Sequence, residues 1–116
     1  MNKEELLERT KKFAHRCVKL ALSLPKTTLG NHIAKQLIRC STSVAANYRA
    51  VCLAQSKASF TSKMSIVLEE ADESAFWLEF IIEEKLVIEN LISSLLEEAK
   101  ELTAMFFSSR KTAIAK

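Results

Sequence analysis

The sequence predicts an all-α protein, an antiparallel four-helix bundle whose helices run up, down, up and down. The 116 residues include a single glycine and a single proline, too few breakers for the many turns of a β-sheet protein. Hydrophobic residues make up 48% of the chain and recur three or four positions apart, which is the period of a helix. Long helices with short connections pack antiparallel, so we expect one domain spanning residues 1–116.

Four helices are expected, at about residues 3–24, 32–54, 58–83 and 88–108. Pro25 ends the first helix because the residue before a proline is pushed out of the helical region. Asn31 is the expected N-cap of the second helix. The third and fourth helices have no breaker between them, so one long bent helix is the alternative there. Residues 109–116 are expected to fray.

Each expected helix has a seam of core residues at helical spacing. In the first two helices the seams are Leu6, Phe13, Cys17, Leu20 and Leu24, and then Ile33, Leu37, Cys40, Val44, Tyr48 and Val51. In the last two they are Phe60, Met64, Val67, Ala71, Ala75, Leu78 and Ile82, and then Ile88, Leu91, Leu95, Ala99, Leu102 and Phe106.

Charge is divided unevenly along the chain. Residues 1–63 hold 12 Lys and Arg against 3 Asp and Glu, whereas residues 64–116 hold 5 against 11, so +9 and −6 sum to the net charge of +3. Two interpretations of this asymmetry are open. In the first, the basic and acidic halves attract each other, within one subunit or between subunits. In the second, the basic half binds nucleic acid. With no aromatic residue interleaved to stack bases, such binding would be directed to the phosphates and tolerant of sequence. The candidate nucleic-acid-binding residues are Lys11, Lys12, His15, Arg16, Lys19, Lys35 and Arg49.

A row of polar residues follows the edge of the core seam in the second helix. Buried polar groups cost free energy unless they find partners, so this row either sets the register of the helices or forms a site. Arg39 is expected to be buried against a carboxylate of the third helix, and breaking that pair would cost about 3–5 kcal/mol. The expected structural polar network is Gln36, Arg39, Ser43, Asn47, Glu69, Glu70 and Glu73.

Large apolar side chains also lie off the core seams, on the outer sides of the second and third helices. One subunit cannot bury both sides of these helices, and large exposed apolar patches mark interfaces. The sequence therefore predicts a homo-oligomer, with an interface that includes Ile38, Leu53, Ile66, Phe76, Trp77 and Phe80.

Several classes of function find no support in the sequence. No Ser/His/Asp or Cys/His arrangement and no glycine-rich phosphate loop can be assigned, so we expect no enzyme and no cofactor. Di-iron bundles need Glu-x-x-His, and no histidine follows a glutamate at that spacing, so no metal site is expected. Three unpaired cysteines (Cys17, Cys40, Cys52), a charged N-terminus and apolar runs too short for a membrane span together predict a cytoplasmic protein.

Two motifs carry a resemblance to a known family. The pattern Q-x-x-R-x-x-x-S-x-x-x-N falls at Gln36, Arg39, Ser43 and Asn47, and E-x-x-E-S-x-x-W-L falls at Glu70, Glu73, Ser74, Trp77 and Leu78. From FAHRCVKLALSLP to about FFSSRKTA, the chain resembles the 23S rRNA intervening-sequence proteins, four-helix bundles once labelled S23 ribosomal proteins. Many members have N-x-x-E at the end of the first motif. Here that position is Ala50, so any role of the glutamate is absent or moved.

The resemblance implies a ring-shaped homopentamer without enzymatic activity. Some members are encoded inside insertions in large-subunit ribosomal RNA genes, and a relative is the nucleic-acid-binding accessory protein of diversity-generating retroelements. We therefore expect a non-enzymatic, oligomeric accessory protein that binds RNA or DNA with little sequence preference. The alternative is a protein–protein interaction scaffold with no nucleic-acid role.

Overall fold

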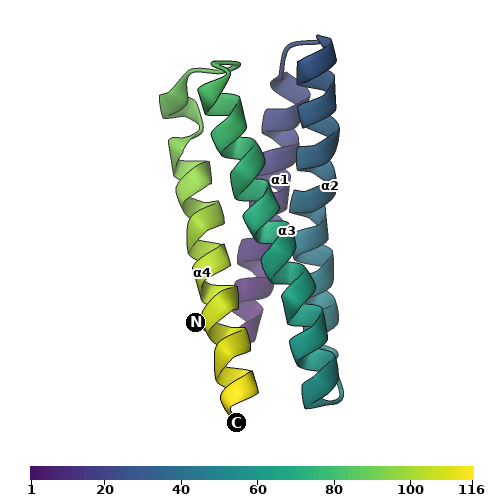
Figure 1. Cartoon of the computed structure of the whole chain (residues 1–116). Helices are drawn as coiled ribbons and strands as arrows, with labels where there is room; N and C mark the ends of the chain where they lie inside the picture. Colours follow the sequence, from purple (N-terminus) through teal and green to yellow (C-terminus); the bar gives the residue numbers. More distant parts are fainter.

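The computed structural model describes residues 1–116 as four helices and one short 3-10 helix. They are α1 (Lys3–Ser23), α2 (Thr28–Val51), α3 (Lys57–Glu83), η1 (Glu89–Leu91) and α4 (Ser93–Ala115). The helices lie side by side in an elongated bundle of 46 × 21 × 21 Å, with both termini toward the same end (Figure 1). The predicted antiparallel four-helix bundle is confirmed.

The second helix begins earlier than its sequence pattern predicts. Thr27 is its N-cap, and the Thr27 hydroxyl accepts a hydrogen bond of 3.0 Å from the backbone N–H of Gly30, so the assignment of Asn31 as N-cap was wrong. Gly30 is buried in the first helical turn, where a Cβ atom would lie 1.9 Å from the carbonyl oxygen of Pro25. The only glycine therefore permits a close approach between the helix start and the loop.

α3 ends at Glu83 although no glycine or proline follows it, so the alternative of one long bent helix in place of the third and fourth helices was wrong. Lys85 takes a positive φ of 55°, its N–H bonds to the carbonyl of Ile82, and the N–H of Leu86 bonds to the carbonyl of Ile81. These two bonds form a Schellman motif, a C-terminal cap that glycine usually provides.

The ends of α4 also differ from the prediction. The helix begins at Ser93 rather than near residue 88, and it continues to Ala115 instead of fraying after residue 108. The break shifts the register of the core, so Ile92 is fully buried while the predicted core residues Ile88 and Leu91 are exposed. In α3, Ile81 is fully buried and Ile82 only partly.

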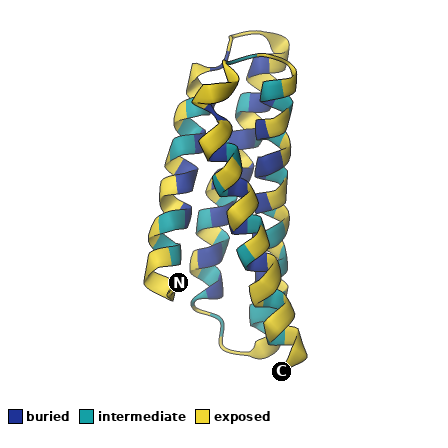
Figure 2. Cartoon of the chain, turned by 90° about the vertical axis from the view of Figure 1, so that its left-hand side faces the viewer, coloured by how far each residue is buried: buried dark blue, intermediate teal, exposed yellow.

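The core runs the length of the bundle on the inward sides of the helices, as the burial colours of Figure 2 show. All six predicted core residues of α2 are buried. The fully buried aromatic rings are those of Phe13 on α1 and Phe106 on α4. The helices are too polar to cross a bilayer over the length required of a membrane span.

Candidate nucleic-acid interface

The seven predicted nucleic-acid-binding residues all reach the surface of α1 and α2. Six are exposed and Arg16 is partly buried. None of the seven forms an ion pair, because the salt bridges of the structure are made by two other residues, Arg9 and Arg39. The positive charges of this surface are therefore free to meet an anion.

Part of this surface lines a groove between α1 and α2. The cationic side chains Lys11 and Arg49 and the imidazole of His15 contribute from both helices. The remaining lining is Leu7, Ala14, Val18, Thr42, Ala45 and Ala46, so the groove is apolar and carries no carboxylate. Ala45 and Ala46 come from α2, and their small side chains leave the groove open.

The other part of the basic surface lies on the opposite flank of α1. Arg16 and Lys19 border a smaller hollow against the end of the α3–α4 connection, lined by Leu20, Ser23, Val87, Leu91 and Leu95. Arg16 donates a hydrogen bond of 3.1 Å to the hydroxyl of Ser94. The candidate residues of α1 therefore lie on two separate surfaces, with Lys12 exposed on α1 one turn before Arg16 and two turns before Lys19.

The seven candidate nucleic-acid-binding residues all lie in a segment that is free of acidic residues. From Arg9 to Lys63 the chain contains no Asp or Glu, because the three acidic residues of the basic half are Glu4, Glu5 and Glu8. The acidic residues of α3 and α4 gather elsewhere, for example where Glu69, Asp72 and Glu79 line a hollow between those two helices. Most of the acidic residues therefore lie on α3 and α4, away from the seven candidate residues.

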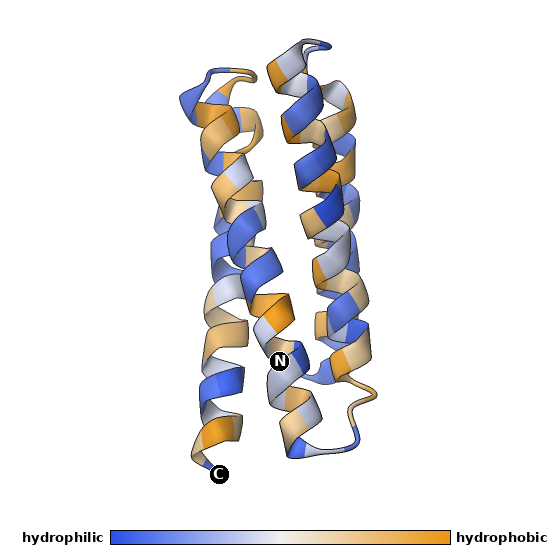
Figure 3. Cartoon of the chain, turned by 45° about the vertical axis from the view of Figure 1, so that its right-hand side comes forward, coloured by the Kyte–Doolittle hydropathy of each residue, from blue (hydrophilic) through white to orange (hydrophobic).

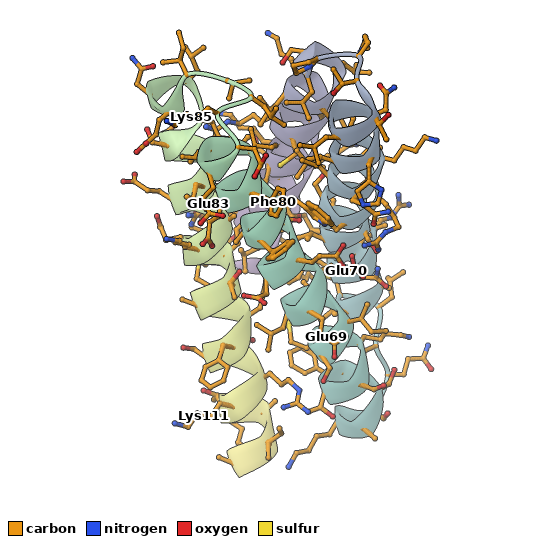
Figure 4. The ribbon with its side chains drawn as sticks, turned by 45° about the horizontal axis from the view of Figure 1, so that its top comes forward. Glu69, Glu70, Phe80, Glu83, Lys85 and Lys111 are labelled. Atoms are coloured by element: carbon orange, nitrogen blue, oxygen red, sulfur yellow. The ribbon has the colours of Figure 1, made fainter.

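Arg39 bridges α2 and α3 as predicted, but it is not buried. Its guanidinium bonds to Glu73 and lies 3.2 Å from a carboxylate oxygen of Glu70, while half of its side chain is exposed. Figure 4 shows Glu70 at the border of α3 with α2. The predicted burial of Arg39 is wrong because α2 and α3 pack so closely that the long side chain is excluded to the rim.

Glu73 is the centre of this surface cluster. The Trp77 indole N–H also donates to it, at 3.1 Å, and Arg39 itself is within 3.4 Å of the amide oxygen of Gln36. Partial burial opposes ionisation of Glu73, but the hydrogen bonds from Arg39 and Trp77 outweigh it and lower the pKa of this carboxyl. The hydrogen bond to Glu73 in turn raises the pKa of Arg39.

The rest of the predicted polar network lies apart from Arg39. The Asn47 amide donates to the carbonyl and the hydroxyl of Ser43, both at 2.9 Å, within α2 alone. Glu69 is exposed and lines the α3–α4 hollow. The single network expected from the sequence is therefore divided into an interhelical cluster and a local pair.

A second arginine makes the more deeply buried interhelical contact, and sequence reasoning missed it. Arg9 on α1 forms a two-bonded pair with Glu98 on α4, both bonds 2.7 Å long, and it reaches Glu101 at 2.8 Å. These hydrogen bonds raise the pKa of Arg9. The available signal was the Glu-x-x-Glu spacing at 98 and 101, the same as at 70 and 73.

The predicted interface residues form an aromatic cluster on the outer side of α3, together with isolated apolar side chains. Ring centroids lie 4.9 Å apart for Phe76 and Trp77 and 5.9 Å apart for Trp77 and Phe80, and His32 of α2 meets Trp77 edge-on. Phe76 is 51% exposed.

The predicted interface residues differ in how far they are buried. Ile38, Trp77 and Phe80 also pack against the core, Ile66 is exposed, and Leu53 lies in the turn after α2. Figure 3 shows hydrophobic residues reaching the outside of the bundle among hydrophilic ones.

The cysteines lie away from these surfaces and form no disulfide. Burial raises the pKa of the Cys17 thiol to about 12 and that of Cys40 to about 11, so both remain protonated at neutral pH. No cluster of three or more His, Cys, Asp or Glu side chains is arranged to hold a metal ion.

Fold and surface together define a small helical bundle with one basic side and one aromatic patch. The family model of the 23S rRNA-intervening sequence protein matches residues 2–108, so the chain belongs to that family. A solved structure from Bacteroides thetaiotaomicron VPI-5482, described as a protein with unknown function from the S23 ribosomal protein family, is similar, with 31% identity and a TM-score of 0.86. The similarity covers 96% of this chain and 99% of that one. No curated protein matches the chain significantly.

Proposed function

We propose that this protein is a non-enzymatic accessory protein that binds nucleic acid through the basic side formed by α1 and α2. The observation that carries the proposal is a set of surface cations without ion-pair partners, on a segment with no carboxylate between Arg9 and Lys63. Cations that face solvent unpaired can release counterions from phosphates, which favours binding to any nucleic acid.

In this proposal the protein acts as a homo-oligomer. The exposed Phe76 and its aromatic neighbours supply apolar surface for subunit contacts, and five subunits is the number that the family resemblance implies. An assembly would repeat the basic side several times. Many weak phosphate contacts would then add up to a useful avidity.

The binding test is a salt series with structured RNA and duplex DNA, alongside the solution mass from light scattering. We expect log affinity to fall with log salt by about 0.7–0.9 for each phosphate neutralised. The reversal variant Lys12→Glu/Arg16→Glu/Lys19→Glu should lose binding and keep the oligomer mass, since these residues lie outside the aromatic cluster.

A matched control changes the net charge equally at another surface. The variant Lys100→Glu/Lys111→Glu/Lys116→Glu alters exposed cations of α4 and of the residue that follows it, and Lys111 projects away from the bundle (Figure 4). It should retain most of the affinity.

The alternative function is a protein-binding scaffold, which the exposed aromatic cluster favours. If the wild-type protein binds neither RNA nor DNA at about 50 mM salt, the nucleic-acid proposal fails and the scaffold is the better account. The same holds if the α1 reversal variant binds as tightly as the wild type. A monomer in solution would contradict the proposed oligomer.

A further inference from the structure

The groove between α1 and α2 has a shape that phosphate binding alone does not require. An exposed lysine such as Lys12 can neutralise a phosphate without any hollow beside it. This groove is instead a hollow of about 580 Å³, within the range of about 300–1,000 Å³ typical of small-ligand sites. Its apolar lining is made of Leu7, Ala14, Val18, Ala45 and Ala46.

We propose that this groove holds one unpaired nucleotide of a single-stranded or looped nucleic acid. The base lies against the apolar lining, and the flanking phosphates meet Lys11 and Arg49 at the rim. This inference rests on the proposed function and names the form of nucleic acid that the basic side takes.

The choice of a nucleotide follows from the charges and the planar groups around the groove. The lining holds two cations and no carboxylate, so it complements an anion with an apolar body. The imidazole of His15 is a planar group of the kind that stacks on unpaired bases. The Thr42 hydroxyl donates to the carbonyl of Ile38 at 2.7 Å, so its oxygen can still accept a hydrogen bond from a base amino group.

A duplex does not place a base in such a groove. Its bases are paired, stacked and enclosed by the two backbones, so a duplex meets the rim cations without filling the hollow. The inference therefore predicts that filling the groove, with all charges kept, separates single-strand binding from duplex binding.

The test compares the full-length wild type with Ala46→Leu, in which a larger side chain occupies the groove from an exposed helical position. Affinities are measured by fluorescence anisotropy for a short unstructured RNA and for the same RNA annealed to its complement. We expect the substitution to weaken single-strand binding about tenfold, the size of effect that loss of one base contact produces. Duplex binding should change by less than about twofold, because the rim charges remain.

Two further variants make the result decisive. Ala104→Leu, at an exposed position of α4, is the matched control and should alter neither affinity. If Ala46→Leu lowers the helical circular dichroism signal, Ala45→Leu replaces it, since Ala45 also lines the groove.

The outcomes distinguish the two proposals. The wild type can bind nucleic acid while the groove variant lowers the affinity for the single strand and the duplex equally, or lowers neither affinity. In that case the nucleotide pocket is overturned and the proposed function stands. If the wild type binds neither probe, both proposals fail. If an acidic amphipathic peptide binds and the groove variant abolishes only that binding, the occupant is a protein helix and the inference is overturned.

Discussion

Two arginines bridge neighbouring helices of this bundle in the same way, and they differ in how much water reaches them. Each one contacts a Glu-x-x-Glu pair, Arg9 from α1 to Glu98 and Glu101 of α4, and Arg39 from α2 to Glu70 and Glu73 of α3. The Arg9 side chain is 20% exposed and that of Arg39 is 49% exposed. The same types of charged group pair in both places, and what differs is the exposure of the arginine to solvent.

The difference follows from how closely each pair of helices packs. α2 and α3 contact each other far more extensively than α1 and α4 do, so apolar side chains fill their contact and the arginine is left at the rim. α1 and α4 approach far less closely, and Arg9 occupies the wider gap, where its Nη1 also lies 3.5 Å from the sulfur of Met105. An ion pair is worth more where water screens it less, so the Arg9 pair should contribute more to stability.

The largest expected effect is that of Arg9→Met, which removes the charge and keeps an apolar stem in the gap. It should lower the free energy of unfolding by about 2 kcal/mol, because Glu98 is left partly buried without its charged partner. Urea unfolding followed by circular dichroism measures this loss. A loss below about 0.5 kcal/mol would mean that the Arg9 pair is no better than an exposed one.

Arg39→Met is the matched substitution at the exposed pair, and its effect should be smaller. Because solvent screens Arg39, the expected loss is about 0.5 kcal/mol, well below the several kcal/mol predicted from a buried position. The same urea titration applies. A loss equal to that of Arg9→Met would break the comparison and restore the view that this cluster sets the helix register.

The smallest expected effect is the acid dependence of the Arg39 cluster. The folded protein lowers the pKa of Glu73 from its ordinary value of 4.5, so the ionised carboxylate favours the folded state. The advantage of the wild type over Glu73→Gln, a few tenths of a kcal/mol near neutrality, should be full above about pH 5. It should disappear as the pH falls below 4.5 through the lowered pKa. Unfolding midpoints of both proteins across that range measure it, and a widening difference in acid would contradict it.

Only part of the proposed site could be predicted from the sequence. Helical spacing alone identified six outward cations of α1 and α2 together with His15, and the structure leaves all seven residues without an ion pair. It did not predict the groove, because a hollow depends on which small residues of two helices face each other. Ala14 of α1 and Ala45 of α2 are ordinary helix residues until packing brings them together.

The helical class and the core seam of α2 follow from the amino-acid sequence alone, because a 3.6-residue period and a shortage of breakers are local properties. The sequence shows these properties without any knowledge of packing. It also determined the segregation of charge between the halves of the chain. Tertiary structure decided where α3 ends, since Lys85 takes a left-handed conformation with no glycine to announce it. It decided as well which arginine is the less exposed, because that depends on the spacing between helices distant in sequence, and no local pattern encodes such a distance.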